Sequence, residues 1–511
     1  MNPIVQLIAV ETSPPSLQDN TGDLDRLRKG VESAAGFMPV VPFSCMGEVA
    51  RKFREAGFKG VAVVNDKDHV MELVDFLHEP PVLLPAMALD LGTTHLEAAL
   101  VDLINGDVLA RANLENRQIQ YGADILTRIH FATKDNGLAV LQSEIVSTIN
   151  ALAEDLAAQA GLEAAAIRAL AVSGNTTMVH LFLGLNPYYL CREPYTPLVN
   201  WPDICLAGDL HLSLHPFSPV WVMPSVGSYF GGDLISGILA SGLAEAEETC
   251  MLIDVGTNAE VVLGNREWLI ACAGAAGPAL EGGVAAMGMR AGPGAVERVA
   301  IDPETLELKY QTIDGSLPKG ICGSGIIDLV ASFYLSRIID IRGKFRTERC
   351  PNRFVQTSQG AAFVVVAADE SADGNPVIFG QVDLDAMMRS KAAMYSILIT
   401  LTNQVGVGFD DLAKIYVAGA FGRHIDPRQA ITLGMLPDLP LETFEPIGNS
   451  SLAGAERVLM EKKSRDTCRE LINKITYLEL NVNQEFMIRF SGSRFIPHTD
   501  TSLFPSVPVF D

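Results

Sequence analysis

The sequence predicts an α/β protein of two related lobes, preceded by a small α/β domain. Short apolar strand patterns alternate with long helical ones along the chain. Two distant stretches, "LDLGTTHLEAAL" and "IDVGTNAEVVLG", share one pattern, in which Asp-x-Gly-Thr separates two apolar runs. The 511 residues are enough for several domains. Each stretch is typical of two strands joined by a tight turn, so the pair indicates a duplicated fold with a phosphate chain held between the halves. A single copy would also fit an ordinary hairpin.

Composition excludes several classes of function. The formal net charge is −23, whereas a nucleic-acid-binding protein normally needs a basic face. The longest uncharged stretch, residues 210–232, contains prolines and glycines and is a poor membrane span. The first 25 residues are polar and lack the basic and apolar regions of a signal peptide. We therefore expect a cytoplasmic protein without nucleic-acid or membrane partners.

The cysteines are spaced too widely for a local metal motif. The chain has eight, and no two lie closer than fourteen positions: Cys45, Cys191, Cys205, Cys250, Cys272, Cys322, Cys350 and Cys468. This spacing excludes the clustered ligands of zinc ribbons and of local iron–sulfur sites. We expect buried free thiols and no iron–sulfur cluster in this chain.

The first 84 residues are expected to form a linker with a helix (1–35) and a small α/β domain (36–84). The helix would follow a cap at Asp19 or Asn20 and present Leu24, Leu27 and Val31 on one side. The small domain is predicted to contain, in order, a broken strand at 37–44, a helix at 45–57, a strand at 59–66 and a helix at 66–79. The proline-rich "PPVLLP" then marks a domain boundary.

Two lobes are predicted to follow, lobe I over 86–240 and lobe II over 241–511. Lobe I should carry the first hairpin, a mostly helical stretch at 123–161, a strand at 167–174 and a helix from Asp233. Lobe II should carry the second hairpin, helices from Gly323 and over 382–406, a strand leading into a glycine loop at 412–422, and C-terminal strands at 475–482 and 484–492.

Glycine-rich turns mark further candidate ligand sites, each with a structural alternative. Gly419 and Gly422 in "YVAGAFGRHID" suit close approach of a nucleoside, or a helix cap. The turn "GICGSG" enters a helix whose free N–H groups favour an anion. Glu281 is one of two charges in the glycine-rich 273–295 segment and would be a ligand or a solvated loop charge. Asp233 would be a helix cap or a carboxylate that orients water or hydrated Mg²⁺.

Together these motifs resemble the superfamily of acetate and sugar kinases, chaperone ATPases and actin, which implies a two-lobed actin-like ATPase fold. Further segments narrow the resemblance to the reductive activators of corrinoid proteins, and it covers the chain from Pro14 to about Gly492. Those segments are "ENRQIQYGADILTRI", "SGNTTMVHLFLGLNP", "GTNAEVVLGN", "AAGPALEGG", "KGICGSGIID", "VAGAFGRHID" and "PIGNSSLAGA".

The resemblance implies an enzyme that uses ATP to drive reduction of a Co(II) corrinoid to Co(I) in a methyltransferase system, with ATP and Mg²⁺ bound. It implies catalytic roles for Asp90, Asp233 and Asp254, with Asp90 and Asp233 holding Mg²⁺ through water. The residues it places around the nucleotide are Gly92, Thr93 and Thr94 in the first phosphate loop, Gly256, Thr257 and Asn258 in the second, Gly419, Ala420 and Gly422 at the nucleoside, and Glu281, Gly323 and Ser324 nearby.

The resemblance also implies partners. Family members usually carry an iron–sulfur module, and this sequence has no cysteine cluster for one, so either a separate protein holds the module or the sequence lacks it by truncation. The expected partners are a corrinoid protein and a separate, ferredoxin-like electron donor. The small 37–77 unit could support a homodimer. Our hypothesis is that lobe closure, driven by γ-phosphate contacts at Thr93 and Thr257, displaces a cobalt ligand or gates the electron's path.

Two other classes of function stay open on the sequence alone. A small-molecule kinase of the same superfamily would place the γ-phosphate on an acid or sugar and not release it as free phosphate. A non-catalytic, actin-like scaffold would sediment in a nucleotide-dependent way.

Overall fold

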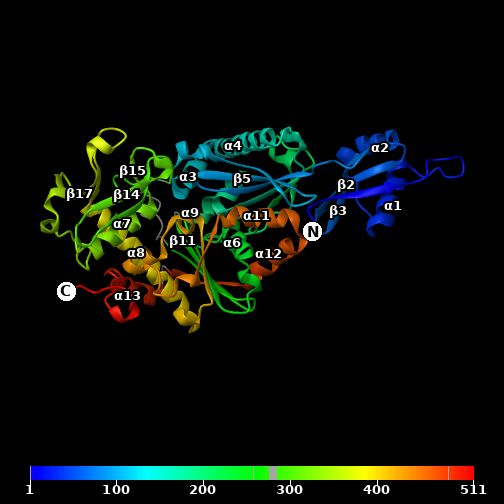
Figure 1. The fold of residues 1–511 in the computed structure, drawn as a ribbon. Coiled ribbons are helices and arrows are strands. Elements are labelled where there is room, and N and C mark those ends of the chain that lie inside the picture. The colour runs from blue at the N-terminus through cyan, green and yellow to red at the C-terminus, as the bar shows by residue number, and fades with distance from the viewer. Residues whose placement is uncertain (1, 257, 275–284, 290, 481–482, 511) are drawn as a thin grey trace. The chain divides into compact units, whose positions relative to one another are not determined.

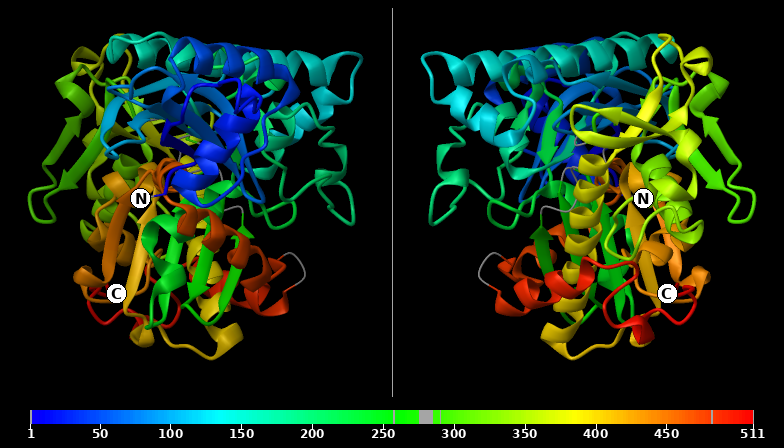
Figure 2. Two further views of the ribbon diagram at one scale, coloured as in Figure 1. Left: turned by 90° about the vertical axis from the view of Figure 1, so that its right-hand side faces the viewer. Right: turned by 90° about the vertical axis from the view of Figure 1, so that its left-hand side faces the viewer.

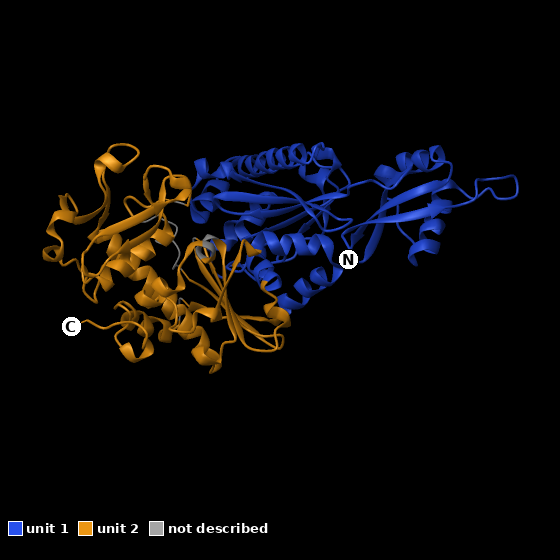
Figure 3. Cartoon of the chain, in the orientation of Figure 1, with its two compact units in different colours: residues 1–240, 451–473 blue, residues 241–450, 474–511 orange. Residues whose placement is uncertain are grey.

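The structure is a computed structural model, and it describes residues 2–256, 258–274, 285–289, 291–480 and 483–510. The chain divides into two compact units, coloured separately in Figure 3. Unit 1 comprises residues 1–240 and 451–473, and unit 2 comprises residues 241–450 and 474–511. The late return of 451–473 to the first unit means that each unit is built from segments far apart in sequence.

Unit 1 begins with a small antiparallel sheet of order β1-β2-β3, made of Val5–Glu11, Lys59–Lys67 and Val70–Leu77. Helices α1 (Asp23–Ala35) and α2 (Met46–Glu55) pack on this sheet (Figure 1). As expected, α1 buries Leu27 and Val31, with Leu24 partly buried beside them. The expected cap was wrong, because α1 begins at Asp23 after Gly22.

Three other expectations for this region were wrong. Residues 66–79 were expected to form a helix because their apolar residues recur every three or four positions, but they contain strand β3 and no helix. The reason is that β3 is buried on both faces, so four consecutive residues from Leu73 to Phe76 are buried. Strand β1, within the stretch expected to be a linker, was missed. The expected broken strand at 37–44 contributes one bridge, Val40 to Glu72, before a short 3-10 helix.

The larger sheet of unit 1 has the order β6-β5-β4-β7-β9-β8. Its central hairpin is β4 (Pro85–Leu91) and β5 (His95–Asp102), and β7 (Leu170–Gly174) runs parallel to β4. The helical expectation for 123–161 is confirmed by α3 (Ile125–Ala132) and α4 (Gly137–Gln159), and Figure 1 shows α4 lying along this sheet. The remaining elements are β6 (Val108–Glu115), β8 (Cys205–Leu206), β9 (Pro219–Val222), α5 (Thr176–Phe182), α6 (Gly232–Ser241), α11 (Ser450–Met460) and α12 (Lys462–Lys474).

Unit 2 repeats this arrangement in a sheet of order β20-β19-β10-β11-β12-β21. Strands β10 (Cys250–Val255) and β11 (Ala259–Gly264) form its hairpin, and β19 (Lys414–Ala418) runs parallel to β10. The order β12-β11-β10-β19-β20 thus matches β6-β5-β4-β7-β9 of unit 1. The duplicated hairpin and the α/β fold class are confirmed. The flanking strands are β12 (Leu269–Gly274), β20 (Phe444–Gly448) and β21 (Ile475–Tyr477).

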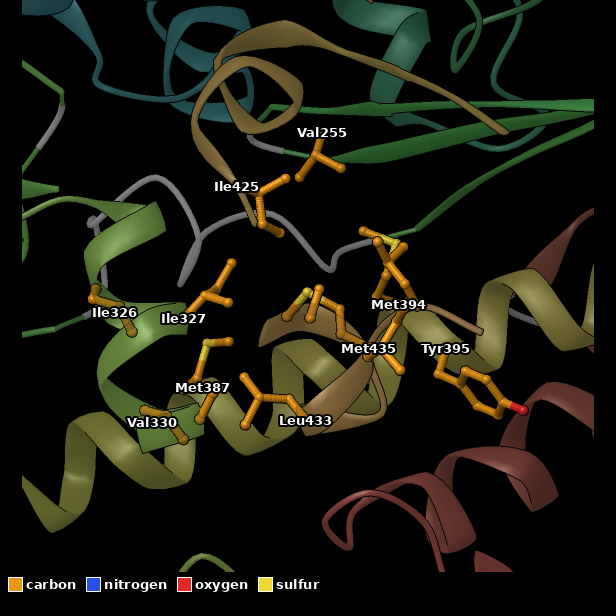
Figure 4. Close-up of a cluster of buried hydrophobic side chains, with 14 of the residues drawn as sticks. Val255, Ile326, Ile327, Val330, Met387, Met394, Tyr395, Ile425, Leu433 and Met435 are labelled. Atoms are coloured by element: carbon orange, nitrogen blue, oxygen red, sulfur yellow. The ribbon is translucent and has the colours of Figure 1, made fainter. Parts of the chain in front are cut away.

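The core of unit 2 lies between its sheet and two long helices, α7 (Gly323–Leu335) and α8 (Gln381–Val405). Figure 4 shows Ile327 and Val330 of α7 directed toward Met387 of α8, with Leu433 and Met435 beside them. Two three-stranded sheets complete the unit: β13 (Ala295–Ile301), β14 (Leu308–Thr312) and β15 (Gly320–Ile321), and β16 (Phe354–Thr357), β17 (Gly360–Val366) and β18 (Val377–Gly380).

The first predicted C-terminal strand is present over the three residues of β21, and its positions 481–482 lie outside the described residues. The second prediction was wrong, because those residues form helix α13 (Gln484–Ser493). Asn483 caps this helix by accepting a hydrogen bond from the Phe486 N–H at 3.0 Å, and Phe486 and Phe490 follow at helical spacing. Helix α13 packs against α8, with the red C-terminal segment beside it in Figure 2. Among the described residues, no helix is long and apolar enough to cross a membrane.

Candidate functional site

The first Asp-x-Gly-Thr loop lies in unit 1, between β4 and β5. Asp90 is the penultimate residue of β4, and Gly92, Thr93 and Thr94 form the turn. Gly92 has no room for a side chain, because a Cβ there would overlap the His95 carbonyl oxygen. The turn therefore exposes its backbone at close range, which is the geometry that a phosphate chain needs.

Asn175 supports this loop, and the sequence analysis did not assign it a role. Its side-chain nitrogen donates a hydrogen bond to Thr93 Oγ1 at 3.0 Å, while its oxygen accepts one from the Met178 N–H and caps α5. Asn116, from the other side, donates to the Gly92 carbonyl at 3.0 Å. The Thr93 hydroxyl is thereby held by a residue at a helix start, and the loop is fixed before any ligand binds.

Asp90 is held by a chain of buried serine hydroxyls. Ser451 Oγ lies 2.8 Å from Asp90 Oδ1 and 2.8 Å from Ser173 Oγ, and Ser173 lies 2.8 Å from Ser236. A carboxylate only accepts hydrogen bonds, so the single Ser451 proton points at Asp90 and Ser173 donates to Ser451. Such a chain polarises each hydroxyl toward the carboxylate. Asp90 and Ser451 are 361 positions apart in sequence, so no local pattern could show the contact.

Ser451→Ala is expected to lower kcat for ATP hydrolysis about tenfold, the cost of losing one hydrogen bond to a charged group. The fold should be retained, because a small side chain replaces a small one. Steady-state phosphate release measures the effect. Ser464→Ala is the matched control, since its buried hydroxyl bonds Glu461, the residue just before its own helix, at 3.1 Å. Equal loss of activity in both variants would contradict a positioning role for Ser451.

Asp233 is the second residue of helix α6 and is partly buried. Its Oδ1 accepts a hydrogen bond from the Leu234 N–H at 2.9 Å. Burial raises its pKa to about 6, above the ordinary value of 3.8, although backbone hydrogen bonds partly oppose the shift. A carboxylate held at this pKa can orient a water or attract a cation near neutral pH.

ATP hydrolysis is expected to fall about tenfold per pH unit below the Asp233 pKa, because only the carboxylate form can act. The same raised pKa means that ionisation of Asp233 costs folding free energy, and this cost grows between pH 3.8 and about 6 and stays constant above. Asp233→Asn should therefore abolish the pH dependence and most activity, yet raise the thermal midpoint at pH 8. The measurements are kcat/KM from pH 5 to 8 and a melting curve. Asp135→Asn, at an exposed loop carboxylate, should change neither. An unchanged pH profile in Asp233→Asn would contradict the assignment.

The second Asp-x-Gly-Thr loop lies in unit 2, between β10 and β11. Asp254 and Gly256 are partly buried and Asn258 is exposed, and the Gly256 N–H donates to the Asn258 carbonyl at 2.9 Å. Thr257 lies outside the described residues. The register differs by one residue between the two hairpins, since Asp90 pairs with Glu97, seven positions on, and Asp254 pairs with Glu260, six positions on.

Gly419 lies against the second loop, at the start of α9 (Gly419–His424) and with φ of 75°. A Cβ there would lie 3.2 Å from Asp254 Oδ1 and 3.2 Å from the Val255 carbonyl oxygen. Gly174, the last residue of β7, occupies the matching place in unit 1, where a Cβ would lie 2.8 Å from the Leu91 carbonyl oxygen. The expected glycine loop after β19 is instead the first turn of α9, which contains Ala420 and Gly422.

The remaining predicted positions belong to the glycine turn that enters α7. Gly323 opens the helix, but Ser324 is buried and its hydroxyl donates to the Glu297 carbonyl at 3.1 Å, a bond within the protein. Glu281 lies outside the described residues.

The carboxylates near the first phosphate loop fit a Mg²⁺ ion that is bound mainly through waters and nucleotide phosphates. Within the described ranges, no three His, Cys, Asp or Glu side chains are grouped to hold a metal ion. Mg²⁺ normally keeps several waters and uses one or two carboxylates together with substrate phosphates. The partly exposed carboxylate of Asp233 and the serine-held Asp90 suit that role in unit 1.

An Asp-x-Gly-Thr hairpin at the same place in two sheets of matching strand order defines the class, an ATPase of the acetate and sugar kinase, chaperone and actin superfamily. The chain belongs to the RACo family within it. The family described as the C-terminal domain of RACo, the ASKHA domain, matches residues 248–508. The RACo middle region matches residues 85–246 and the RACo linker region matches residues 1–79.

Similar proteins agree with this assignment. The chain is 30% identical to the corrinoid activation enzyme RamQ of Eubacterium limosum, over 95% of this chain and 82% of that protein. It is 25% identical to the [Co(II) methylated amine-specific corrinoid protein] reductase of Methanosarcina barkeri, over 76% of this chain and 72% of that protein. The solved structure of a reductive activator for corrinoid, iron–sulfur protein matches with a TM-score of 0.91 and 37% identity, covering 99% of this chain and 81% of that one.

Proposed function

We propose that this protein is an ATP-dependent reductive activator of a corrinoid protein. The observation that carries the proposal is the similarity of the whole chain to the solved reductive activator, with a TM-score of 0.91 over 99% of the chain. The presence of both Asp-x-Gly-Thr loops supports ATP hydrolysis as the source of energy. A similarity limited to the ATPase lobes would have left the kinase alternative equally strong.

The reaction is balanced by one electron. Co(II) of the corrinoid gains an electron and becomes Co(I), a reduced iron–sulfur protein loses one, and water takes the γ-phosphoryl group of ATP to give ADP and phosphate. Each mismatch of about 59 mV between donor and cobalt disfavours a one-electron transfer tenfold. Hydrolysis can offset that mismatch if the protein binds the partner differently before and after the phosphate is lost.

Separate parts of the chain would perform separate tasks. The backbone at Gly92 and the Thr93 hydroxyl bind phosphate oxygens, Asp233 orients the attacking water, and Asp90 and Asp233 hold Mg²⁺ through water. Mg²⁺, when bound, supplies charge neutralisation at the phosphates. Asp254, Gly256 and Asn258 form the second phosphate loop. The electron donor is a separate, ferredoxin-like iron–sulfur protein.

The fate of the γ-phosphate tests this function against the kinase alternative. The protein is incubated with ATP labelled at the γ-phosphate, Mg²⁺, and a corrinoid protein held as Co(II), either the corrinoid iron–sulfur protein or a methylated-amine-specific corrinoid protein. We expect the label as free phosphate, released faster with the Co(II) protein than without it. Label on an acid or sugar acceptor, with no effect of any corrinoid protein, would overturn the proposal.

A further inference from the structure

Exposed tyrosines gather on one surface of unit 1. The chain has ten tyrosines, and the four that are exposed among the described residues are Tyr188, Tyr189, Tyr195 and Tyr229, which are 37–56% exposed. Three belong to the loop of residues 185–201, which Figure 2 shows in blue-green at the margin of unit 1. The Tyr188 and Tyr189 rings stack 5.3 Å apart and the Tyr195 and Tyr229 rings lie 5.9 Å apart, and these two pairs are here called the tyrosine surface.

The tyrosine surface has the composition of a protein interface. The loop contains only two charged residues, Arg192 and Glu193, in a chain with a net charge of −23. The Arg192 guanidinium lies 5.5 Å from the centre of the Tyr188 ring, which stacks edge-on with Tyr189. Tyrosine and arginine are enriched at protein interfaces, and other charged side chains are depleted.

One end of the loop is bonded to the segment that carries Asp233. The Ser228 hydroxyl donates to the Tyr195 carbonyl, and the Gly227 N–H donates to Asn200 Oδ1 at 3.1 Å. Tyr229 lies four residues before Asp233 on the same segment. A movement of the loop therefore acts directly on the backbone that leads into Asp233.

A second path leads to the first phosphate loop through the buried His180. The Leu198 N–H donates to His180 Nε2 at 3.1 Å, so the other ring nitrogen, Nδ1, carries the proton and donates to the Thr176 carbonyl at 2.7 Å. Burial lowers the pKa of His180, which keeps the ring neutral as this arrangement requires. Thr176 adjoins Asn175, the residue that holds the Thr93 hydroxyl.

We propose that the tyrosine surface docks the Co(II) corrinoid protein, and that docking alters the positions of Thr93 and Asp233. This inference rests on the proposed function, which names the partner. An activator wastes ATP unless hydrolysis responds to its partner, and a docking loop hydrogen-bonded to the segments that lead to both groups provides that response. The two paths of hydrogen bonds on this surface supply a physical link between partner and nucleotide.

The test uses Tyr188→Ser/Tyr189→Ser, which removes exposed rings and should not affect folding. We expect at least a tenfold rise in Kd for the Co(II) corrinoid protein, loss of partner-stimulated phosphate release, and basal release within twofold of the wild type. Met487→Ser/Ile488→Ser, two exposed apolar residues on α13, is the matched control and should change none of these. Hydrogen exchange of the wild type should show protection of 185–201 in the complex.

The outcomes separate the two proposals. A wild-type chain that neither binds nor responds to any corrinoid protein overturns the proposed function and this inference with it. Normal binding and stimulation in the tyrosine variant, without protection of the loop, overturns this inference alone. A wild-type dimer that the tyrosine substitutions convert to a monomer, with corrinoid binding unchanged, would assign the surface to self-association and overturn it as well.

Discussion

Arg465→Met is expected to lower the free energy of unfolding by about 3–5 kcal/mol, the usual cost of removing one partner of a buried ion pair. Arg465 on α12 and Asp66 on β2 are each 1% exposed, and their side chains meet at 3.0 Å. Arg465 also donates to the Val458 carbonyl at 2.8 Å. Loss of the guanidinium would leave the Asp66 carboxylate buried, with Lys462 at 3.7 Å as its nearest remaining cation.

Urea unfolding followed by fluorescence measures this change, with Arg51→Met as the matched control. Arg51 pairs with Glu55 at 2.6 Å, but both side chains are more than half exposed, so about 0–1 kcal/mol is expected. The double variant Asp66→Asn/Arg465→Met should recover part of the loss, because no charge remains buried. Equal destabilisation by Arg465→Met and Arg51→Met would show that the buried pair does not hold strand β2 of the small domain to helix α12.

Gly92→Ala is expected to lower kcat/KM for ATP about 100-fold, the effect of displacing a phosphate loop by roughly 1 Å. The added Cβ would overlap the His95 carbonyl oxygen, which is backbone and cannot rotate away. The β4–β5 turn must therefore open, and the N–H groups that approach the phosphates move with it.

Phosphate release and nucleotide affinity together test this prediction. Gly47→Ala, in helix α2, is the matched control because a Cβ there meets nothing within 4 Å, and it should leave both unchanged. The melting temperature of each variant reports whether the fold survives. Wild-type ATP hydrolysis in a folded Gly92→Ala protein would show that this loop does not approach the nucleotide.

The features predicted best from the sequence are those set by residues that are neighbours along the chain. Asp-x-Gly-Thr between two apolar runs is a strong hairpin signal when it occurs twice, and both hairpins are present. The prediction of a helix at 66–79 was wrong because burial of both faces gave strand β3 the apolar spacing of a helix. The prediction of a strand at 484–492 was wrong because the apolar run of α13 resembled a strand. The segment's length and its capping residue would have predicted α13 better than its apolar pattern did, because Asn483 marks a helix start.

The supporting residues of the site could not be predicted in the same way. Ser451 reaches Asp90 across 361 positions, and Arg465 reaches Asp66 across 399. Both contacts depend on α11 and α12 returning to the first unit, which no local pattern encodes. Asn175 is different, since an Asn just before a helix is a capping signal, and its position after a strand could have suggested a second role.

The central claim is that ATP hydrolysis by this chain drives the reduction of a corrinoid cobalt. The most direct test follows the absorption spectrum of a Co(II) corrinoid protein with the purified chain, Mg²⁺, and a reduced ferredoxin whose potential lies above that of the cobalt. Our account predicts that Co(I) accumulates with ATP, and does not accumulate without ATP or with Gly92→Ala. Co(I) formation at the same rate and extent without nucleotide would contradict it.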